Sequence, residues 1–305
     1  MGGVLNGFAV VGGIVLVGYL LGRLHILPDT GRDVLARLAF FVASPALLFQ
    51  LLSGAELHEI FSPVLWVTVM ATAISALTFI AIGALRHWGV AKTALGSMCA
   101  SYVNAGNLGL PLAAYVLGNP AAMAPVMLFQ LMVFAPAATT VIDLATARRT
   151  SVWQIVLTPL RNPIVVGAVL GVVAAVADWQ PAQPIADMID ALAGMAVPSL
   201  LLAYGISLYG SVVPGRGEDG ILLVAAMALK LVVQPVAAWL LGEFAFGLHG
   251  QDLLAVVFIA ALPTAQNIFI YAVRFRTGEV LARDAILVST TAAPFLLMGV
   301  AALFG

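Results

Sequence analysis

The chain has 305 residues, of which 62% are hydrophobic and only 9% are charged, and its formal net charge is −1. A soluble globular protein carries about 25% charged residues, so these polar side chains are too few to cover a surface that faces water. The composition excludes an ordinary soluble protein and indicates an integral membrane protein. A net charge near zero, without a stripe of Lys and Arg, argues against a nucleic-acid partner.

Apolar stretches alternate along the whole chain with short joints that are charged or rich in Pro and Gly. A bilayer span needs about 20 apolar residues, so the chain predicts an all-α protein in the lipid bilayer with ten transmembrane helices and no separate soluble domain. The predicted spans are residues 4–22, 34–53, 63–85, 93–117, 121–145, 162–177, 185–209, 220–242, 252–273 and 284–304.

The basic residues predict the orientation of these spans. Twelve of the 13 Lys and Arg residues lie in the joints after the odd-numbered spans, and the joints after the even-numbered spans hold none. Cytoplasmic joints are enriched in Lys and Arg, so the odd joints are predicted to be cytoplasmic and both termini external.

The second half of the chain resembles the first. At an offset of 153 residues the aligned pairs are Gly18 with Gly171, Pro28 with Pro181, and Pro45 with Pro198. Five spans per repeat is an odd number, so the second repeat enters the membrane inverted, as is typical of secondary transporters. We predict a first repeat at residues 1–146, a cytoplasmic connector at 147–161 and an inverted second repeat at 162–305. Small residues four apart, Gly18 with Gly22 and Gly167 with Gly171, predict close helix packing.

Spans 4 and 9 each contain a polar stretch with a proline at the middle of the membrane, at residues 104–111 and 261–267. Proline removes a backbone N–H, and the freed backbone groups persist in a membrane only where protein or a water-filled cavity satisfies them. If the two breaks meet, the N-terminal ends of half-helices present N–H donors that suit a carboxylate. The residues predicted to shape the breaks are Gly106, Gly109, Pro111, Leu262 and Pro263. The residues predicted to bind the substrate there are Asn104, Asn107, Thr264, Gln266 and Asn267. The alternative is that these amides only bond neighbouring helices around two packing kinks.

Other polar residues within the spans are candidates as well. Lys230 lies at the middle of span 8, where a charge is costly, and is predicted to face the cavity and balance an anionic substrate. Its alternative is a structural pairing with a backbone carbonyl or an acid. Gln130 is predicted to line the same cavity, with packing as its alternative. The candidates for cavity lining or coupling are Ser44 and Ser199, beside the aligned prolines, and Asp143, whose alternative is an ion pair with Arg148.

Three motifs together resemble the auxin efflux carrier family, whose bacterial members include malonate-transporter-like proteins and whose plant members are the PIN carriers. They are Asn104 to Pro111, Leu262 to Asn267, and Arg161-Asn-Pro163 with Gly171 behind it. The resemblance extends over essentially the whole chain. It implies that spans 4 and 9 cross at their prolines, and that the polar contacts to substrate fall on Asn104, Asn107, Gln266 and Asn267. It also implies a scaffold of spans 1, 2, 6 and 7, a transport domain of spans 3–5 and 8–10, and a homodimer in the bacterial inner membrane.

The sequence therefore predicts a secondary transporter that moves an organic carboxylate by elevator-like alternating access. It predicts no cofactor, and leaves H⁺ or Na⁺ open as the coupling ion. One alternative is a sodium- or proton-coupled carrier of the bile-acid or cation-antiporter type, which would need intramembrane carboxylates that neither broken stretch contains. A non-transporting receptor is another alternative. An enzyme is not expected, because no nucleophile–base pair or metal-binding cluster is visible within the spans.

Overall fold

The computed structural model describes residues 2–28, 30–54, 62–109, 112–113, 116–146, 163–209 and 219–304. Helices make up this described part, which contains no β-strand. Six of its helices are long and apolar enough to cross a membrane. The prediction of an all-α, multi-pass membrane protein is confirmed, whereas the count of ten spans and the inverted repeat stay predictions.

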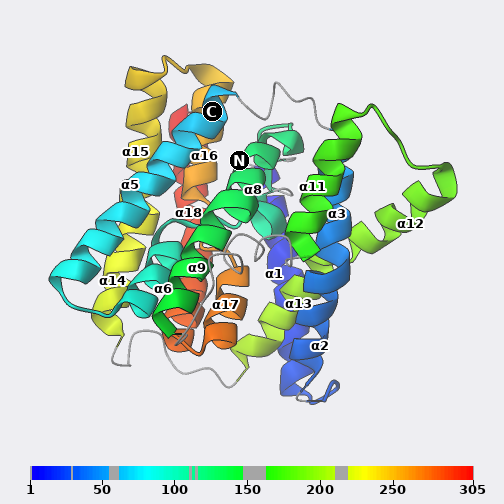
Figure 1. The fold of residues 1–305 in the computed structure, drawn as a ribbon, viewed down its shortest axis with the longest axis horizontal. Helices are drawn as coiled ribbons and strands as arrows, with labels where there is room; N and C mark the ends of the chain where they lie inside the picture. Colours follow the sequence, from blue (N-terminus) through cyan, green and yellow to red (C-terminus); the bar gives the residue numbers. More distant parts are fainter. Residues whose placement is uncertain are drawn as a thin grey trace. The chain divides into compact units, whose positions relative to one another are not determined.

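The chain divides into two compact units, each built from both halves of the sequence (Figure 1). The larger unit comprises residues 1–5, 61–156 and 212–305, and the smaller unit comprises residues 6–60 and 157–211. The smaller unit thus contains the segments predicted as spans 1, 2, 6 and 7, and the larger unit contains the others. Their roles as scaffold and transport domain stay predictions.

The smaller unit contains α1 (Gly2–Arg23) from residue 6 onward, together with α2 (Gly31–Leu38), η1 (Ala39–Ala43), α3 (Ser44–Ser53), α11 (Pro163–Val176), α12 (Gln183–Gly194) and α13 (Ala196–Leu208). In Figure 1, α3 and α11 lie side by side, and among the described residues they make the most extensive helix pair. The pair approaches closely because Gly167 has no Cβ, which would lie 2.7 Å from the Cα of Pro45. Gly171 lies in the same way against Phe49, so the predicted close packing of this glycine pair is confirmed.

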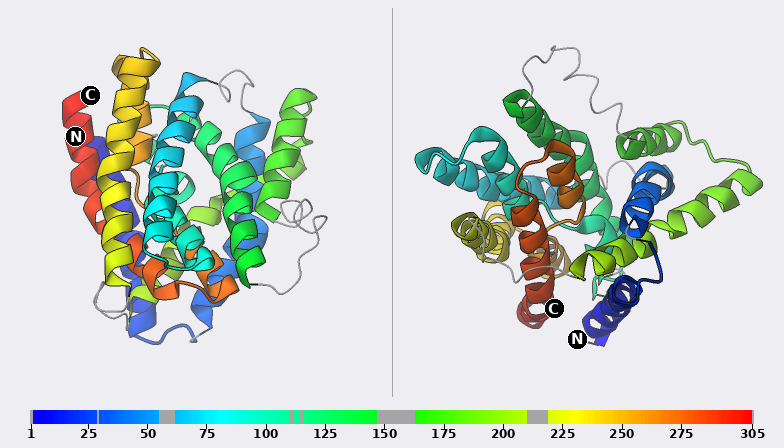
Figure 2. Two further views of the ribbon diagram at one scale, coloured as in Figure 1. Left: turned by 60° about the vertical axis from the view of Figure 1, so that its left-hand side comes forward. Right: turned by 90° about the horizontal axis from the view of Figure 1, so that it is seen from below.

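The larger unit contains α5 (Pro63–Leu85), α6 (Val90–Ser101), η2 (Ala105–Gly109), η3 (Pro120–Met123), α8 (Ala124–Phe129), η4 (Gln130–Phe134), α9 (Ala135–Thr146), α14 (Gly220–Ala228), η6 (Leu229–Val233), α15 (Gln234–Leu240), η7 (Leu241–Ala245), α16 (Gly250–Ala261), α17 (Asn267–Phe275) and α18 (Glu279–Phe304). In Figure 2, α14 (yellow) runs beside α18 (red), and the two helices are in contact. Helix α16 packs against α5, α15 and α18, and every residue from Leu253 to Ala261 is buried. The two short helices α16 and α6 therefore form the inside of this unit.

Three helices widen into a π-helical turn just before a proline. The turns η1, η4 and η6 end two residues before Pro45, Pro136 and Pro235, respectively. In an ordinary α-helix the proline ring clashes with the carbonyl four residues earlier, and the wider turn relieves that clash. In η6 the turn closes with a bond from Gln234 N to Leu229 O, five residues apart. Lys230 lies within this widened turn.

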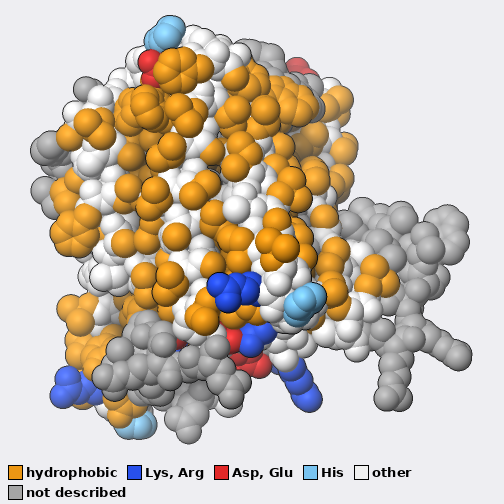
Figure 3. Space-filling view, turned by 90° about the vertical axis from the view of Figure 1, so that its left-hand side faces the viewer, with side chains coloured by type: hydrophobic (Ala, Val, Ile, Leu, Met, Phe, Trp, Pro, Cys, Tyr) orange, Lys and Arg blue, Asp and Glu red, His pale blue; other side chains and the backbone are white. Residues whose placement is uncertain are grey.

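Apolar side chains cover the middle of the face shown in Figure 3, and the Lys and Arg side chains visible there lie in its lower part, while acidic and His side chains are also seen at its top. Large apolar residues are widely exposed on the larger unit, including Leu77 at 63% and Val224 at 70%. Such a surface is unfavourable in water but suits a lipid bilayer, in which charged groups are confined near the edges.

Replacing Gly18 with Ala is expected to destabilise the smaller unit. A Cβ there would lie 3.0 Å from the Cα of Gly205 and press against the carbonyl oxygen of Leu202. Overpacking of this kind costs about 1–3 kcal/mol. The control is Gly12→Ala on the same helix, where the new Cβ would meet nothing within 4 Å. Thermal unfolding of the purified protein in detergent is expected to give a lower midpoint for Gly18→Ala than for Gly12→Ala, and equal midpoints would contradict close packing of α1 on α13.

Candidate functional site

Two helices of the larger unit stop near its centre, at the stretches that the sequence marks with polar residues. Helix α6 ends at Ser101 and α16 ends at Ala261, and a new helix, α17, begins at Asn267. We call residues 102–104 and 262–266, which lie between the helical segments, the paired breaks.

The paired breaks bond to each other through their backbones. Asn104 N donates a hydrogen bond to Pro263 O at 2.8 Å. Ala265 N donates to Tyr102 O at 3.1 Å. The result is one antiparallel bridge centred on Val103 and Thr264. Backbone groups that leave a helix in an apolar interior must find such partners, and here each break provides them for the other.

The carbonyl groups at the end of α6 are capped one after another by side chains from α5, from α15 and from the second break. Their donors are Thr264 Oγ1 for Cys99 O, Ser75 Oγ for Ala100 O, and Gln234 Nε2 for Ser101 O, each at 2.8 Å. Thr264 is 0% exposed, and its backbone N–H donates to Ser289 Oγ at 3.0 Å. The end of this helix is therefore satisfied by protein groups rather than by water.

The side chain of Gln130 bonds to the backbone of Val103 in the first break. It lies in the π-helical turn η4 and is 2% exposed. With its amide nitrogen toward Val103 O (3.0 Å), its amide oxygen accepts from Val103 N (2.9 Å). Gln130 thus replaces both backbone bonds that Val103 would make in a helix, and its predicted role in lining a cavity stays a prediction.

Lys230 is 0% exposed in the structure. Its Nζ donates to Ala260 O and to Gln234 Oε1, both at 2.7 Å. This is the pairing with a backbone carbonyl that the sequence leaves open as the structural alternative. In this conformation the side chain is inside the larger unit, so a contact with substrate stays a prediction.

The side-chain amide of Asn267 is only partly hydrogen-bonded among the described residues. Its Nδ2 donates to Tyr102 Oη at 3.4 Å, whereas its Oδ1 is buried and has no hydrogen-bond partner among the described residues. Asn267 opens α17, so its amide lies at the positive end of a helix. The side chains of Asn104 and Gln266, which flank the bridge, are 2% and 7% exposed.

The small and apolar residues of the breaks are tightly placed. A Cβ on Gly109 would lie 2.9 Å from both Leu262 Cδ1 and Met123 Sδ, so a larger residue there would force these side chains to shift. Gly106 is less constrained, since its nearest neighbour would be Met127 Cε at 3.5 Å. Leu262 is 0% exposed. The side chain of Asn107 and the whole of Pro111 lie outside the described residues.

The remaining candidates lie elsewhere in the chain. Ser44, the first residue of α3, is partly buried, and Ser199 on α13 is 6% exposed; both belong to the smaller unit. Asp143 is partly buried on α9, and its predicted partner Arg148 lies outside the described residues. The sequence-based set omits Ser75, Ser289 and Tyr102. Hydroxyl groups in membrane helices commonly bond their own preceding turn, so nothing in the sequence distinguishes these three.

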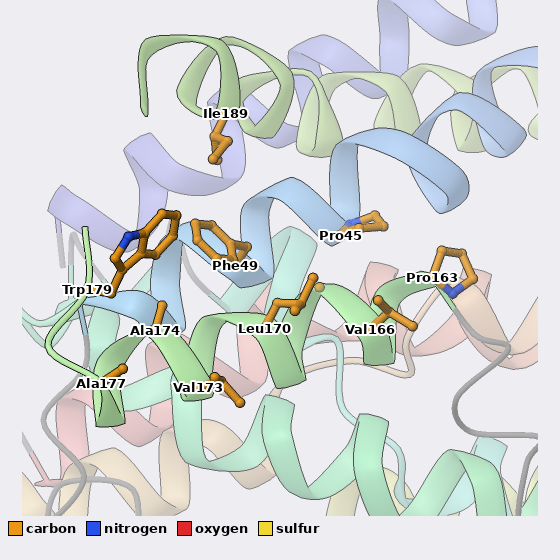
Figure 4. Close-up of a pocket in the computed structure, with 11 residues that line it drawn as sticks. Pro45, Phe49, Pro163, Val166, Leu170, Val173, Ala174, Ala177, Trp179 and Ile189 are labelled. Carbon is orange, nitrogen blue, oxygen red and sulfur yellow. The ribbon is translucent and has the colours of Figure 1, made fainter. Parts of the chain in front are cut away.

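The smaller unit contains an apolar cavity of about 850 Å³ (Figure 4). Its lining residues are Pro45, Phe49, Pro163, Val166, Gly167, Leu170, Val173, Ala174, Ala177, Trp179 and Ile189. None of them carries a charge, so the cavity is unsuited to a carboxylate.

A multi-pass membrane protein with a pair of interrupted helices has the architecture of a membrane transporter. Comparison with known proteins agrees: the family described as "Membrane transport protein" matches residues 8–155 and 145–299. The chain belongs to this family, that of the auxin efflux carriers, as its motifs predict. It is also 29% identical over 299 residues to a protein of Rhizobium meliloti (strain 1021) named "Putative malonate transporter", covering 91% of this chain and 88% of that protein. Both comparisons point to transport rather than to catalysis.

Replacing Thr264 with Val is expected to destabilise the larger unit, because the change keeps the shape but leaves Cys99 O buried without its donor. An unsatisfied buried carbonyl costs about 1–3 kcal/mol. The matched control is Thr291→Val on α18, since Thr291 is exposed and bonds only Leu287 O of its own helix. Thermal unfolding is expected to show a clear loss of stability for Thr264→Val and almost none for Thr291→Val. Equal losses would show that the bond from Thr264 to the end of α6 contributes nothing.

Proposed function

We propose that this protein is a secondary transporter of organic carboxylates and that the substrate carboxylate binds at the paired breaks. The observation that carries the proposal is the amide of Asn267. It lies at the N-terminus of α17, beside a break whose other described bonds are internal, and its Oδ1 has no partner among the described residues. A carboxylate needs a donor, and this amide provides one when it turns by 180°, because Oδ1 then accepts from the Tyr102 hydroxyl and Nδ2 is free to donate. A polar group left over in an apolar interior is costly unless a ligand or water uses it.

The electrostatics of this site favour an anion of low charge. A helix N-terminus carries about +0.5 of an elementary charge. The side chains around it are neutral amides and the Tyr102 hydroxyl, and the ammonium of Lys230 bonds Ala260 O and Gln234 on the other side of the break. Such a site binds one carboxylate group through hydrogen bonds. The relative's name supports a small carboxylate such as malonate as the first compound to test.

The two units support a division of labour in an elevator-like transport cycle. The larger unit holds both broken helices and seals their ends with its own side chains, so that it can move with its substrate site intact. The smaller unit, built from the segments predicted as spans 1, 2, 6 and 7, would be the scaffold and the contact in a homodimer. The proposed location is the bacterial inner membrane with both termini external, in line with the basic joints.

The isosteric change Asn267→Asp is expected to abolish most of the transport. Two like charges 4 Å apart repel by about 1 kcal/mol in water and about 4 kcal/mol at an effective dielectric constant of 20, so carboxylate flux should fall at least about fivefold. The measurement is the current from proteoliposomes on a solid-supported membrane, challenged with malonate, with other mono- and dicarboxylates and with an indole acid.

The control for this change is Asn119→Asp, which makes the same substitution at an exposed position. It is expected to retain the wild-type current. A wild-type protein that binds carboxylates but carries none of them would be a receptor, and one that neither binds nor carries them would refute the proposed substrate class. Equal currents from Asn267→Asp and the wild type would place the site elsewhere.

A further inference from the structure

The buried ammonium group of Lys230 has a specific position relative to both broken helices. Its Nζ lies 2.7 Å from Ala260 O, which is in the last turn of α16. It lies equally close to Oε1 of Gln234, one turn further along the same helix. Gln234 in turn donates Nε2 to Ser101 O, the last residue of α6. The Lys230–Gln234 pair therefore reaches the C-terminal ends of both α6 and α16.

These two helix ends create a local excess of negative potential. Each helix C-terminus carries about −0.5 of an elementary charge, so the two together approach −1. A single ammonium group balances that sum. Among the described residues the ion pairs are Arg32–Asp33, Lys92–Asp219 and Arg283–Asp284, so the partner of Lys230 there is the backbone and not a carboxylate.

The groups around the Lys230 ammonium are those that a metal cation would use. Ala260 O and Gln234 Oε1 are neutral oxygen ligands, and Gln234 is held in place through its Nε2, which donates to Thr72 Oγ1 at 3.3 Å. In transporters with broken helices, carbonyls at the C-terminal ends of half-helices commonly coordinate a coupling cation. Here the ammonium group of Lys230 already occupies such a position, at the carbonyl of Ala260 near the C-terminal end of α16.

We propose that Lys230 is a built-in substitute for a coupling cation, and that the protein consequently requires no Na⁺ to hold its two broken helices together or to transport its substrate. Lys230 acts as a positioning residue: it keeps the ends of α16 and α6 in place through Ala260 and Gln234 and does not touch the substrate. For flux, the inference rests on the proposed function; for structural stability, it does not.

Two substitutions separate the charge of Lys230 from its volume. Lys230→Ala removes the four terminal atoms of the side chain and leaves a space with two oxygen acceptors at its far end, Ala260 O and Gln234 Oε1, which Na⁺, ammonium or n-propylammonium can enter. Lys230→Met removes the charge but fills the space. The melting temperature of each purified protein is measured in choline chloride, sodium chloride, ammonium chloride and n-propylammonium chloride at equal ionic strength.

The wild type is expected to melt at the same temperature in choline and in sodium. Lys230→Ala is expected to melt lower in choline, and to regain stability with a saturable dependence on at least one of the small cations. Lys230→Met is expected to gain nothing from any of them. A melting temperature of the wild type that rises with sodium, or identical responses of Lys230→Ala and Lys230→Met to the cations, would overturn the proposal.

A third variant, Lys230→Arg, serves if both of these fail to fold. It keeps a cation at this position, so it is expected to fold and to melt at the same temperature in choline and in sodium. A requirement for sodium in Lys230→Arg would equally overturn the proposal.

The rate of carboxylate transport provides a second test of the proposal. Wild-type carboxylate transport is expected to be equal in sodium and in choline, and Lys230→Met is expected to lose at least about tenfold, because two buried acceptors lose their donor. Sodium-dependent wild-type flux, or full flux in Lys230→Met, would refute the substitute-cation role. A wild type that transports no carboxylate would refute the proposed function alone, since the melting series decides the role of Lys230 without it.

Discussion

The larger unit depends on one constraint: a helix that stops inside a membrane leaves backbone groups that no water can satisfy. The structure meets this constraint locally. Two helices stop at the same place, and their unwound residues exchange the bonds from Asn104 N to Pro263 O and from Ala265 N to Tyr102 O. Thr264 and Gln234 add the donors that the end of α6 still lacks. The breaks are therefore stable only as a pair.

The two ends of the broken helices create opposite electrostatic requirements, and the chain meets them in different ways. The Lys230–Gln234 pair donates hydrogen bonds to carbonyl groups at the C-terminal ends of α6 and α16. The N-terminal end of α17 has the neutral amide of Asn267, which keeps one buried oxygen without a described partner. An internal cation at the C-terminal ends, and an amide at the helix N-terminus that can turn its N–H groups toward a ligand, support the proposed binding of a single carboxylate group. A fixed cation facing the substrate would instead favour more highly charged anions and slow their release.

The positions of the broken helices could be predicted from the sequence, because Pro and polar residues are costly inside an apolar span unless the helix is interrupted there. The predicted span at residues 63–85 coincides with α5, which begins at Pro63. Helix α16 ends two residues before Pro263, where the missing N–H and the ring of proline make a helix hard to continue. The family could be predicted from the same motifs.

The hydrogen-bond partners of the buried polar side chains could not be predicted from the sequence. Lys230 needs an acceptor, but Ala260, 30 residues away, becomes that acceptor only because α15 packs on α16. The pairing of Gln130 with Val103 is equally non-local.

The most direct test of the account is a cryo-EM structure of the protein saturated with a transported carboxylate in a lipid nanodisc. The account predicts new density against the N-terminus of α17 and the amide of Asn267, with Lys230 still bonded to Ala260 and not to the ligand. Density for the carboxylate in the apolar cavity between α3 and α11, or a ligand bonded directly to Lys230, would contradict it.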